Sequence, residues 1–176
     1  MTKTWIIFLL SGFFGLPHLS AQVANGFNWG NAFGSSSTEQ SLAVATDSNN
    51  NTYYVGQFSG VVDFNPGTGV FNMTPVGFAD CYIVKLDGNG NFSWAKSIGG
   101  SGLTVPSDVA VDNSGNVCFT GYFTGSTDFD PGAGVVTFTA SGTTDIFVCK
   151  LNSSGNYVWA VSAGNGRGAK KVRPEM

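Results

Sequence analysis

Apolar and polar residues alternate along most of this chain with a period of two, rather than the 3.6 residues of a helix. Runs of this kind, rich in β-branched and aromatic residues, predict short strands. The predicted strands are residues 41–47, 52–58, 81–86 and 92–98, followed by 107–112, 117–123, 146–151 and 157–162. Because no stretch of ten residues carries a helical apolar stripe, we expect an all-β fold.

The second group of strands repeats the first at a spacing of 65 residues. Without gaps, residues 29–93 and 94–158 are identical at 23 of 65 positions. The recurring residues include Trp29, Trp94 and Trp159, Asp47 and Asp112, Gly56 and Gly121, and Asp80 and Asp145. Tandem units that each hold four short strands joined by tight turns are typical of β-propeller blades.

A single blade cannot bury both of its faces and must stack against neighbours. We therefore predict an incomplete β-propeller with one four-stranded blade over residues 41–99 and a second over 100–164. Residues 27–29 match 92–94, which predicts an orphan outer strand at 27–33 within a leading segment, 22–40. Closed propellers need about four to eight blades, so two blades indicate part of a larger protein.

Each repeat carries an extra segment between its second and third strands. The sequences Asp63-Phe-Asn-Pro-Gly67 and Asp128-Phe-Asp-Pro-Gly132 predict an added hairpin in each blade. Asp63, Asp128 and Asp130 would then lie on one face, where they are candidates for a cation site or a partner surface. We favour the alternative that the aspartates cap the turns while Phe64 and Phe129 pack between blades.

The turn Asp87-Gly-Asn-Gly-Asn91 resembles the start of a calcium loop, which places oxygen ligands at alternate positions. It lacks the later acidic ligand, and the matching turn begins with Asn152 instead of an acid. A hairpin turn that needs Gly or Asn at positive φ explains the same residues without metal. Calcium is therefore a weak expectation at Asp63, Asp87, Asp128 and Asp130, and no other cofactor is expected.

Residues 1–21 have the pattern of a secretory signal peptide. Lys3 precedes an apolar run of 12 residues, 5–16, and Leu19-Ser-Ala21 forms a small-residue cleavage site. The run is shorter than the roughly 20 residues that span a bilayer; an uncleaved anchor is the alternative. We predict a secreted or cell-surface protein whose mature chain has no membrane span.

Cleavage would remove His18, the only histidine in the sequence. A mature chain without histidine excludes Ser-His-Asp and Cys-His catalysis and a His-ligated zinc site.

The three cysteines and the C-terminus leave alternatives open. An odd count in an exported protein predicts at least one free or intermolecular thiol. Cys118 and Cys149 fall on strands placed side by side, which allows a bridge, although we favour burial of Cys81, Cys118 and Cys149 as small apolar residues.

Residues 165–176 depart from the repeat as an atypical basic tail, which indicates a truncated, frame-shifted or fragmentary product or else a disordered tail.

Composition narrows the function further. Charged residues make up 11% of the chain and the net charge is −3, with no basic stripe in the body of the chain. Nucleic acid is therefore not an expected partner. The 42% hydrophobic content can supply a core, which argues against a disordered chain.

Three stretches carry a family resemblance. They are residues 112–125, with Asp-x-x-Gly-Asn, residues 128–132, Asp-Phe-Asp-Pro-Gly, and residues 145–159, which end in Gly-Asn-x-x-Trp. Together they resemble the bacterial SBBP-type β-propeller repeat over residues 27–164. The resemblance implies a large exported or surface protein and carries no common catalytic residues.

The pattern therefore predicts an exported, non-enzymatic propeller segment that serves as an interaction or surface scaffold. Its partner would be an unidentified protein or glycan, and the open blade faces predict self-association. Two alternatives are a calcium-stabilised adhesin module and a hydrolase that uses paired carboxylates. The recurring tryptophans could stack on sugar rings, but packing at the rim of each blade explains their spacing as well.

Overall fold

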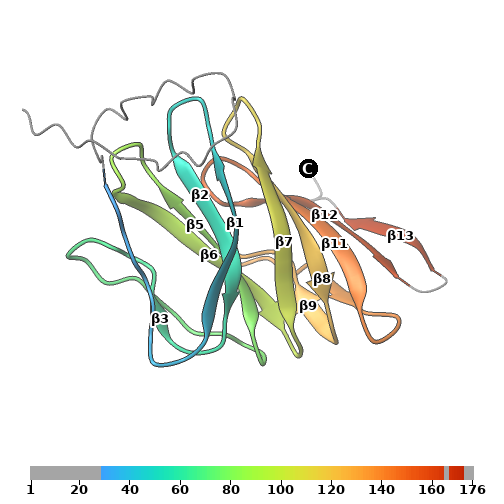
Figure 1. The fold of residues 1–176 in the computed structure, drawn as a ribbon. Helices are drawn as coiled ribbons and strands as arrows, with labels where there is room; N and C mark the ends of the chain where they lie inside the picture. Colours follow the sequence, from blue (N-terminus) through green and yellow to red (C-terminus); the bar gives the residue numbers. More distant parts are fainter. Residues whose placement is uncertain (1–28, 165–166, 173–176) are drawn as a thin grey trace, which may run out of the picture. The chain divides into compact units, whose positions relative to one another are not determined.

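A computed structural model describes residues 29–164 and, for the backbone, 167–172 (Figure 1). Its described residues are all-β, as expected, and contain no helix. The strands are β1 (Glu39–Thr46), β2 (Thr52–Phe58), β3 (Val62–Asp63), β4 (Asn72–Met73), β5 (Asp80–Leu86), β6 (Phe92–Gly100), β7 (Thr104–Val111), β8 (Val117–Phe123), β9 (Ser126–Asp128), β10 (Thr137–Thr139), β11 (Asp145–Leu151), β12 (Tyr157–Gly164) and β13 (Arg167–Val172).

Two antiparallel meanders confirm the predicted blades. Strands β1, β2, β5 and β6 pair in that order to form blade 1, and β7, β8, β11 and β12 pair in the same order to form blade 2. Tight turns join the strands because the chain places glycines at positive φ where the strands reverse: Gly90 at 81°, Gly115 at 76° and Gly155 at 78°. Glycine adopts this region without the steric cost that a Cβ brings.

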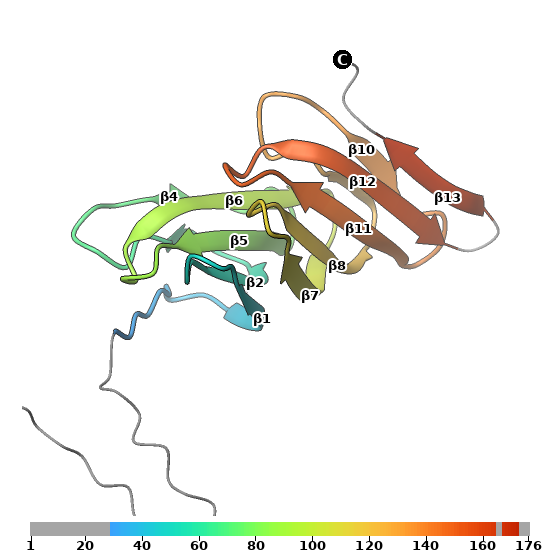
Figure 2. The same cartoon turned by 90° about the horizontal axis from the view of Figure 1, so that it is seen from above.

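The blades stack face to face around one apolar core. The first strands, β1 and β7, lie side by side in both views (Figures 1 and 2). Between the blades, Tyr53, Val55 and Ile83 of blade 1 share a buried cluster with Phe119 and Phe147 of blade 2. A blade thus buries one of its faces only against the next repeat, which is the arrangement that the 65-residue spacing predicts.

Both added hairpins are present. Strand β3 pairs with β4, and β9 pairs with β10, around the two Pro-Gly turns. Strand β9 also pairs with the end of β6, where Gly99 lies opposite Asp128 and Gly100 opposite Thr127. The hairpin of blade 2 therefore extends the sheet of blade 1 and fastens the two blades together by backbone hydrogen bonds.

The segment before blade 1 differs in detail from the prediction. Residues 29–38 form no strand, and residues 27–28 of the predicted orphan strand lie outside the described residues. Even so, Phe33 packs beside Tyr54 and Phe64, with ring centroids 5.9 and 6.1 Å away. Phe33 matches Ile98 of β6 one repeat later. The segment therefore packs on blade 1 at the place that the repeat predicts, but it forms no strand there.

The C-terminal departure from the repeat also folds. Residues 167–172 form β13, which pairs antiparallel with β12 at the outer edge of blade 2, with Lys171 opposite Val161. The expectation of a disordered tail is therefore wrong for these residues. The predicted signal peptide, 1–21, lies outside the described residues, among which no helix is long and apolar enough to cross a bilayer.

Candidate functional site

Four turns share one hydrogen-bonding plan at the Asp-x-x-Gly-Asn sequences and their variants. Asp87 Oδ1 accepts the backbone N–H groups of Asn89 and Asn91 at 2.8 and 2.9 Å, and its Oδ2 accepts the Asn91 amide at 2.9 Å. Equivalent bonds occur at Asp47, Asp112 and Asn152. These side-chain oxygens, three carboxylates and one amide, mimic a backbone turn, which is the role that sequence analysis favoured over calcium ligation.

These bonds also explain the acidity of the turn aspartates. Hydrogen bonds from Asn116 and the ammonium group of Lys150, 2.9 Å away, hold the pKa of Asp112 well below its usual range. A depressed folded-state pKa stabilises the fold above the unfolded pKa of about 3.9, and that contribution is lost as the pH falls.

We expect Asp112→Asn to fold, because Asn152 holds the turn between β11 and β12 of the same blade through Oδ1 alone. The variant should lose less stability than the wild type between pH 4 and pH 2, since the titrating carboxylate is gone. Urea unfolding across that interval provides the measurement. Parallel pH profiles for the two proteins would contradict the assignment.

The hairpin aspartates are likewise engaged. Asp63 Oδ1 accepts the N–H groups of Asn65 at 3.0 Å and Phe71 at 2.8 Å. Asp128 does the same for Asp130 and Val136 at 3.1 and 2.8 Å, and Asp130 in turn accepts the N–H of Gly132 at 2.8 Å. Among the residues that the structure describes, no three His, Cys, Asp or Glu side chains gather as a metal site would require.

The recurring Asp80 and Asp145 are buried carboxylates that hold a loop. Asp80 accepts the N–H groups of Val76 at 2.8 Å and Gly77 at 3.3 Å, and lies against Gly99 of β6, where an added Cβ would fall 1.9 Å from the carboxyl carbon. Burial raises the pKa of Asp80, and these hydrogen bonds oppose that shift. Asp145 accepts the N–H of Ser141 at 3.0 Å in the matching place. Both residues therefore have an architectural role.

The recurring glycines and tryptophans belong to the packing as well. A Cβ on Gly121 would fall 2.1 Å from the Val105 carbonyl, and one on Gly56 1.8 Å from the Gln40 carbonyl, so adjacent strands approach too closely for a side chain. Trp94 donates from Nε1 to the Ser153 carbonyl at 3.1 Å and thereby bridges blade 1 to a turn of blade 2. Trp29 and Trp159 are half-buried.

The cysteines are free thiols, and the register explains why. Cys149 lies opposite Phe119, whereas Cys118 lies opposite Lys150. The two cysteines therefore point to opposite faces of the sheet, and the bridge that sequence analysis left open is excluded. Cys81 and Cys149 are fully buried, and burial raises the pKa of both thiols, which makes them unreactive packing residues.

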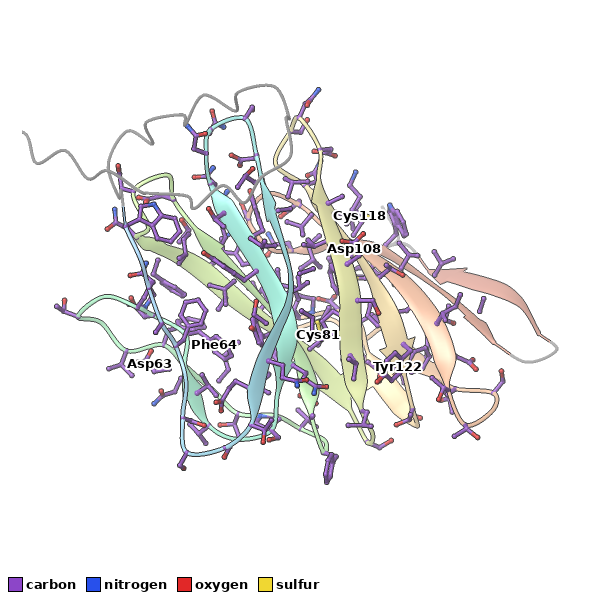
Figure 3. All side chains as sticks on the ribbon, viewed as in Figure 1. Asp63, Phe64, Cys81, Asp108, Cys118 and Tyr122 are labelled. Atoms are coloured by element: carbon purple, nitrogen blue, oxygen red, sulfur yellow. The ribbon has the colours of Figure 1, made fainter. Side chains whose placement is uncertain are left out.

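One face of blade 2 remains uncovered. In register, Ile146 lies opposite Tyr122 on this face, and they are 61% and 39% exposed. The equivalent face of blade 1 holds Cys81, Ile83 and Val55, all fully buried against blade 2. Figure 3 labels residues of both faces: Cys81 belongs to the covered face of blade 1, and Cys118 and Tyr122 of β8 belong to the Ile146 face of blade 2.

Two hollows flank blade 1. The first, of about 240 Å³, is lined by the aromatic residues Phe33, Tyr54, Phe64 and Tyr82 together with smaller and polar side chains. The second, of about 370 Å³, lies between the first added hairpin and the turn after β5, with Asn31 beside it. Sequence analysis missed both, because each joins side chains from several segments that are distant in the sequence.

The comparisons with known proteins agree with the fold. No protein-family model matches the chain. Over 112 residues, the chain is 34% identical to an uncharacterised WD repeat-containing protein of Acanthamoeba polyphaga mimivirus; the match covers 56% of this chain but only 8% of that relative. The sheet topology and this similarity define a β-propeller repeat protein. The finer resemblance to SBBP-type repeats stays a prediction.

Proposed function

We propose that this protein is an exported, non-enzymatic β-propeller scaffold of the SBBP type that acts as part of a larger assembly. The pattern of residues 1–21 supports export. Rigid turns and hairpins that recur at the same ends of both blades support binding of a partner through repeated loops. The aspartates that a hydrolase would need are instead engaged in turns and loop caps.

The uncovered face of blade 2 is the observation that carries the assembly part of this proposal. The two blades can be compared directly, because in blade 1 the equivalent face is covered by blade 2. An apolar patch of this kind costs free energy in water and is relieved by association. Association of two copies, each through the equivalent face, follows from the same argument.

We expect residues 22–176 to self-associate with increasing concentration in sedimentation equilibrium. Ile146→Arg should shift the population toward monomer, because a charge would then have to be buried in the contact. Val135→Arg, at a position 76% exposed on the hairpin loop, serves as the matched control and should leave association unchanged. A wild-type chain that stays monomeric and unfolds in one sharp transition would contradict the proposal.

A further inference from the structure

The second hollow of blade 1 is lined by uncharged polar groups. It lies between residues 65–69 of the added hairpin and residues 89–92 of the turn that follows β5, and Asn31 completes it. Its volume of about 370 Å³ is within the range of sites that bind small molecules. No charged side chain is among the described residues that line it.

The asparagines of this hollow retain hydrogen-bonding capacity. Asn31 donates from Nδ2 to the Gly90 carbonyl at 2.7 Å, which fixes the side chain and leaves Oδ1 as an acceptor. Asn65 accepts the Gly67 N–H at 2.9 Å through Oδ1, which leaves its Nδ2 as a donor. The Asn89 side chain makes no hydrogen bond with the part of the chain that the structure describes, so both its donor and its acceptor are available.

One aromatic side chain lines the same hollow, and a second packs against it. Phe92 contributes to the lining, and its ring centroid lies 5.0 Å from that of Phe71 in a tilted arrangement. Phe71 is 39% exposed and Phe92 is half-buried, so the pair presents apolar surface next to the amides. An apolar wall beside a few converging polar groups is the usual composition of a small-molecule site.

The internal repeat shows that blade packing does not require this composition. One repeat later, Lys96 of β6 replaces Asn31, and its side chain lies over Gly155 of blade 2, where an added Cβ would fall 3.0 Å from Lys96 Cε. Asp130 and Ser154 replace Asn65 and Asn89. The equivalent place in blade 2 therefore carries charge and is covered by an alkyl chain, although the turn beneath it accepts the same two backbone N–H groups.

We propose that this hollow binds a neutral carbohydrate. Sugar hydroxyls both donate and accept hydrogen bonds, and amides provide both functions without attracting a charged ligand. The C–H face of a pyranose ring is apolar and can pack on Phe92, as weak C–H contacts to aromatic rings allow. The proposal deepens and rests on the scaffold function, since it names the chemical class of one partner.

Isothermal titration of residues 22–176 with cellotetraose, maltotetraose, mannotetraose and chitotetraose tests the site. We expect at least one of these neutral tetrasaccharides to bind. Asn31→Lys, which copies Lys96 at the matching position of the repeat, and Asn89→Ala should each weaken that binding at least tenfold. Ser154→Ala, at the position in blade 2 that matches Asn89, is the control and should leave binding unchanged.

Thermal unfolding of each variant shows that the fold is retained, since neither substituted side chain belongs to the core. No binding of any of the four sugars, or binding that Asn31→Lys and Asn89→Ala leave unchanged, would overturn the carbohydrate site. Either result would leave the scaffold function intact, because self-association through Ile146 is measured separately and does not involve this hollow.

Discussion

Phe129→Ala is expected to lower the free energy of unfolding by about 3–5 kcal/mol. The Phe129 side chain is fully buried, and its ring centroid lies 5.4 Å from Phe123, 5.2 Å from Phe138 and 5.0 Å from Phe147. These rings come from three different strands and from the hairpin loop, so the surroundings cannot collapse onto the gap without moving the sheet. Removal of the ring costs both its transfer free energy and the cavity that remains.

Urea unfolding provides the measurement, and Phe78→Ala is the matched control. Phe78 is 79% exposed on the loop before β5, so the same substitution there should change stability by roughly 0.5 kcal/mol or less. Similar losses for the two variants would show that Phe129 is not part of a packed core between hairpin and blade.

Gly99→Ala is expected to destabilise the protein by about 3 kcal/mol. The added methyl group would fall 1.9–2.1 Å from the carboxyl atoms of Asp80. Asp80 is fully buried and accepts hydrogen bonds from Val76 and Gly77. The carboxylate would have to move away from these donors, and a buried charged group that loses its partners carries a large desolvation penalty.

Gly34→Ala is the control that the repeat itself provides. Gly34 precedes blade 1 at the position that matches Gly99, but a Cβ there would meet only Glu39, at 3.8 Å, which is an ordinary contact. Thermal unfolding should place this variant close to the wild type. Equal losses for the two substitutions would mean that the close approach of Gly99 to Asp80 is not what the substitution disturbs.

Much of the fold could be predicted because the same local rules operate twice. The turns at Asp47, Asp87, Asp112 and Asn152 fix where strands reverse, and the two Pro-Gly sequences fix the hairpins. Strand positions follow from these signals to within a few residues. Burial of Asp80 and Asp145 could not be predicted in the same way, because a carboxylate is tolerated in a core only where hydrogen-bond donors satisfy it. The sequence does not show that the loop just before each aspartate turns its backbone N–H groups, from Val76, Gly77 and Ser141, toward the carboxylate.

The errors arise where the repeat stops. Residues 167–172 lack the apolar alternation of the other strands, yet β13 forms because the edge of β12 offers unpaired backbone groups. The amide-lined hollow depends on a difference between repeats, Asn31 against Lys96, rather than on their similarity. Positions that are identical in the two repeats therefore predict the fold. The candidate ligand site is found only when the side chains that differ between the repeats are compared in the structure.

The most direct test of the account is to place a further copy of residues 100–164 after Gly164 and measure stability and self-association together. If the exposed face around Ile146 and Tyr122 is a blade interface, the added blade should cover it. We expect the free energy of unfolding to rise by several kcal/mol, on the order of one interface between repeats, and the concentration-dependent association through Ile146 to weaken. An extended chain with unchanged stability, whose added repeat unfolds independently, would contradict the assignment of the two sheets as propeller blades.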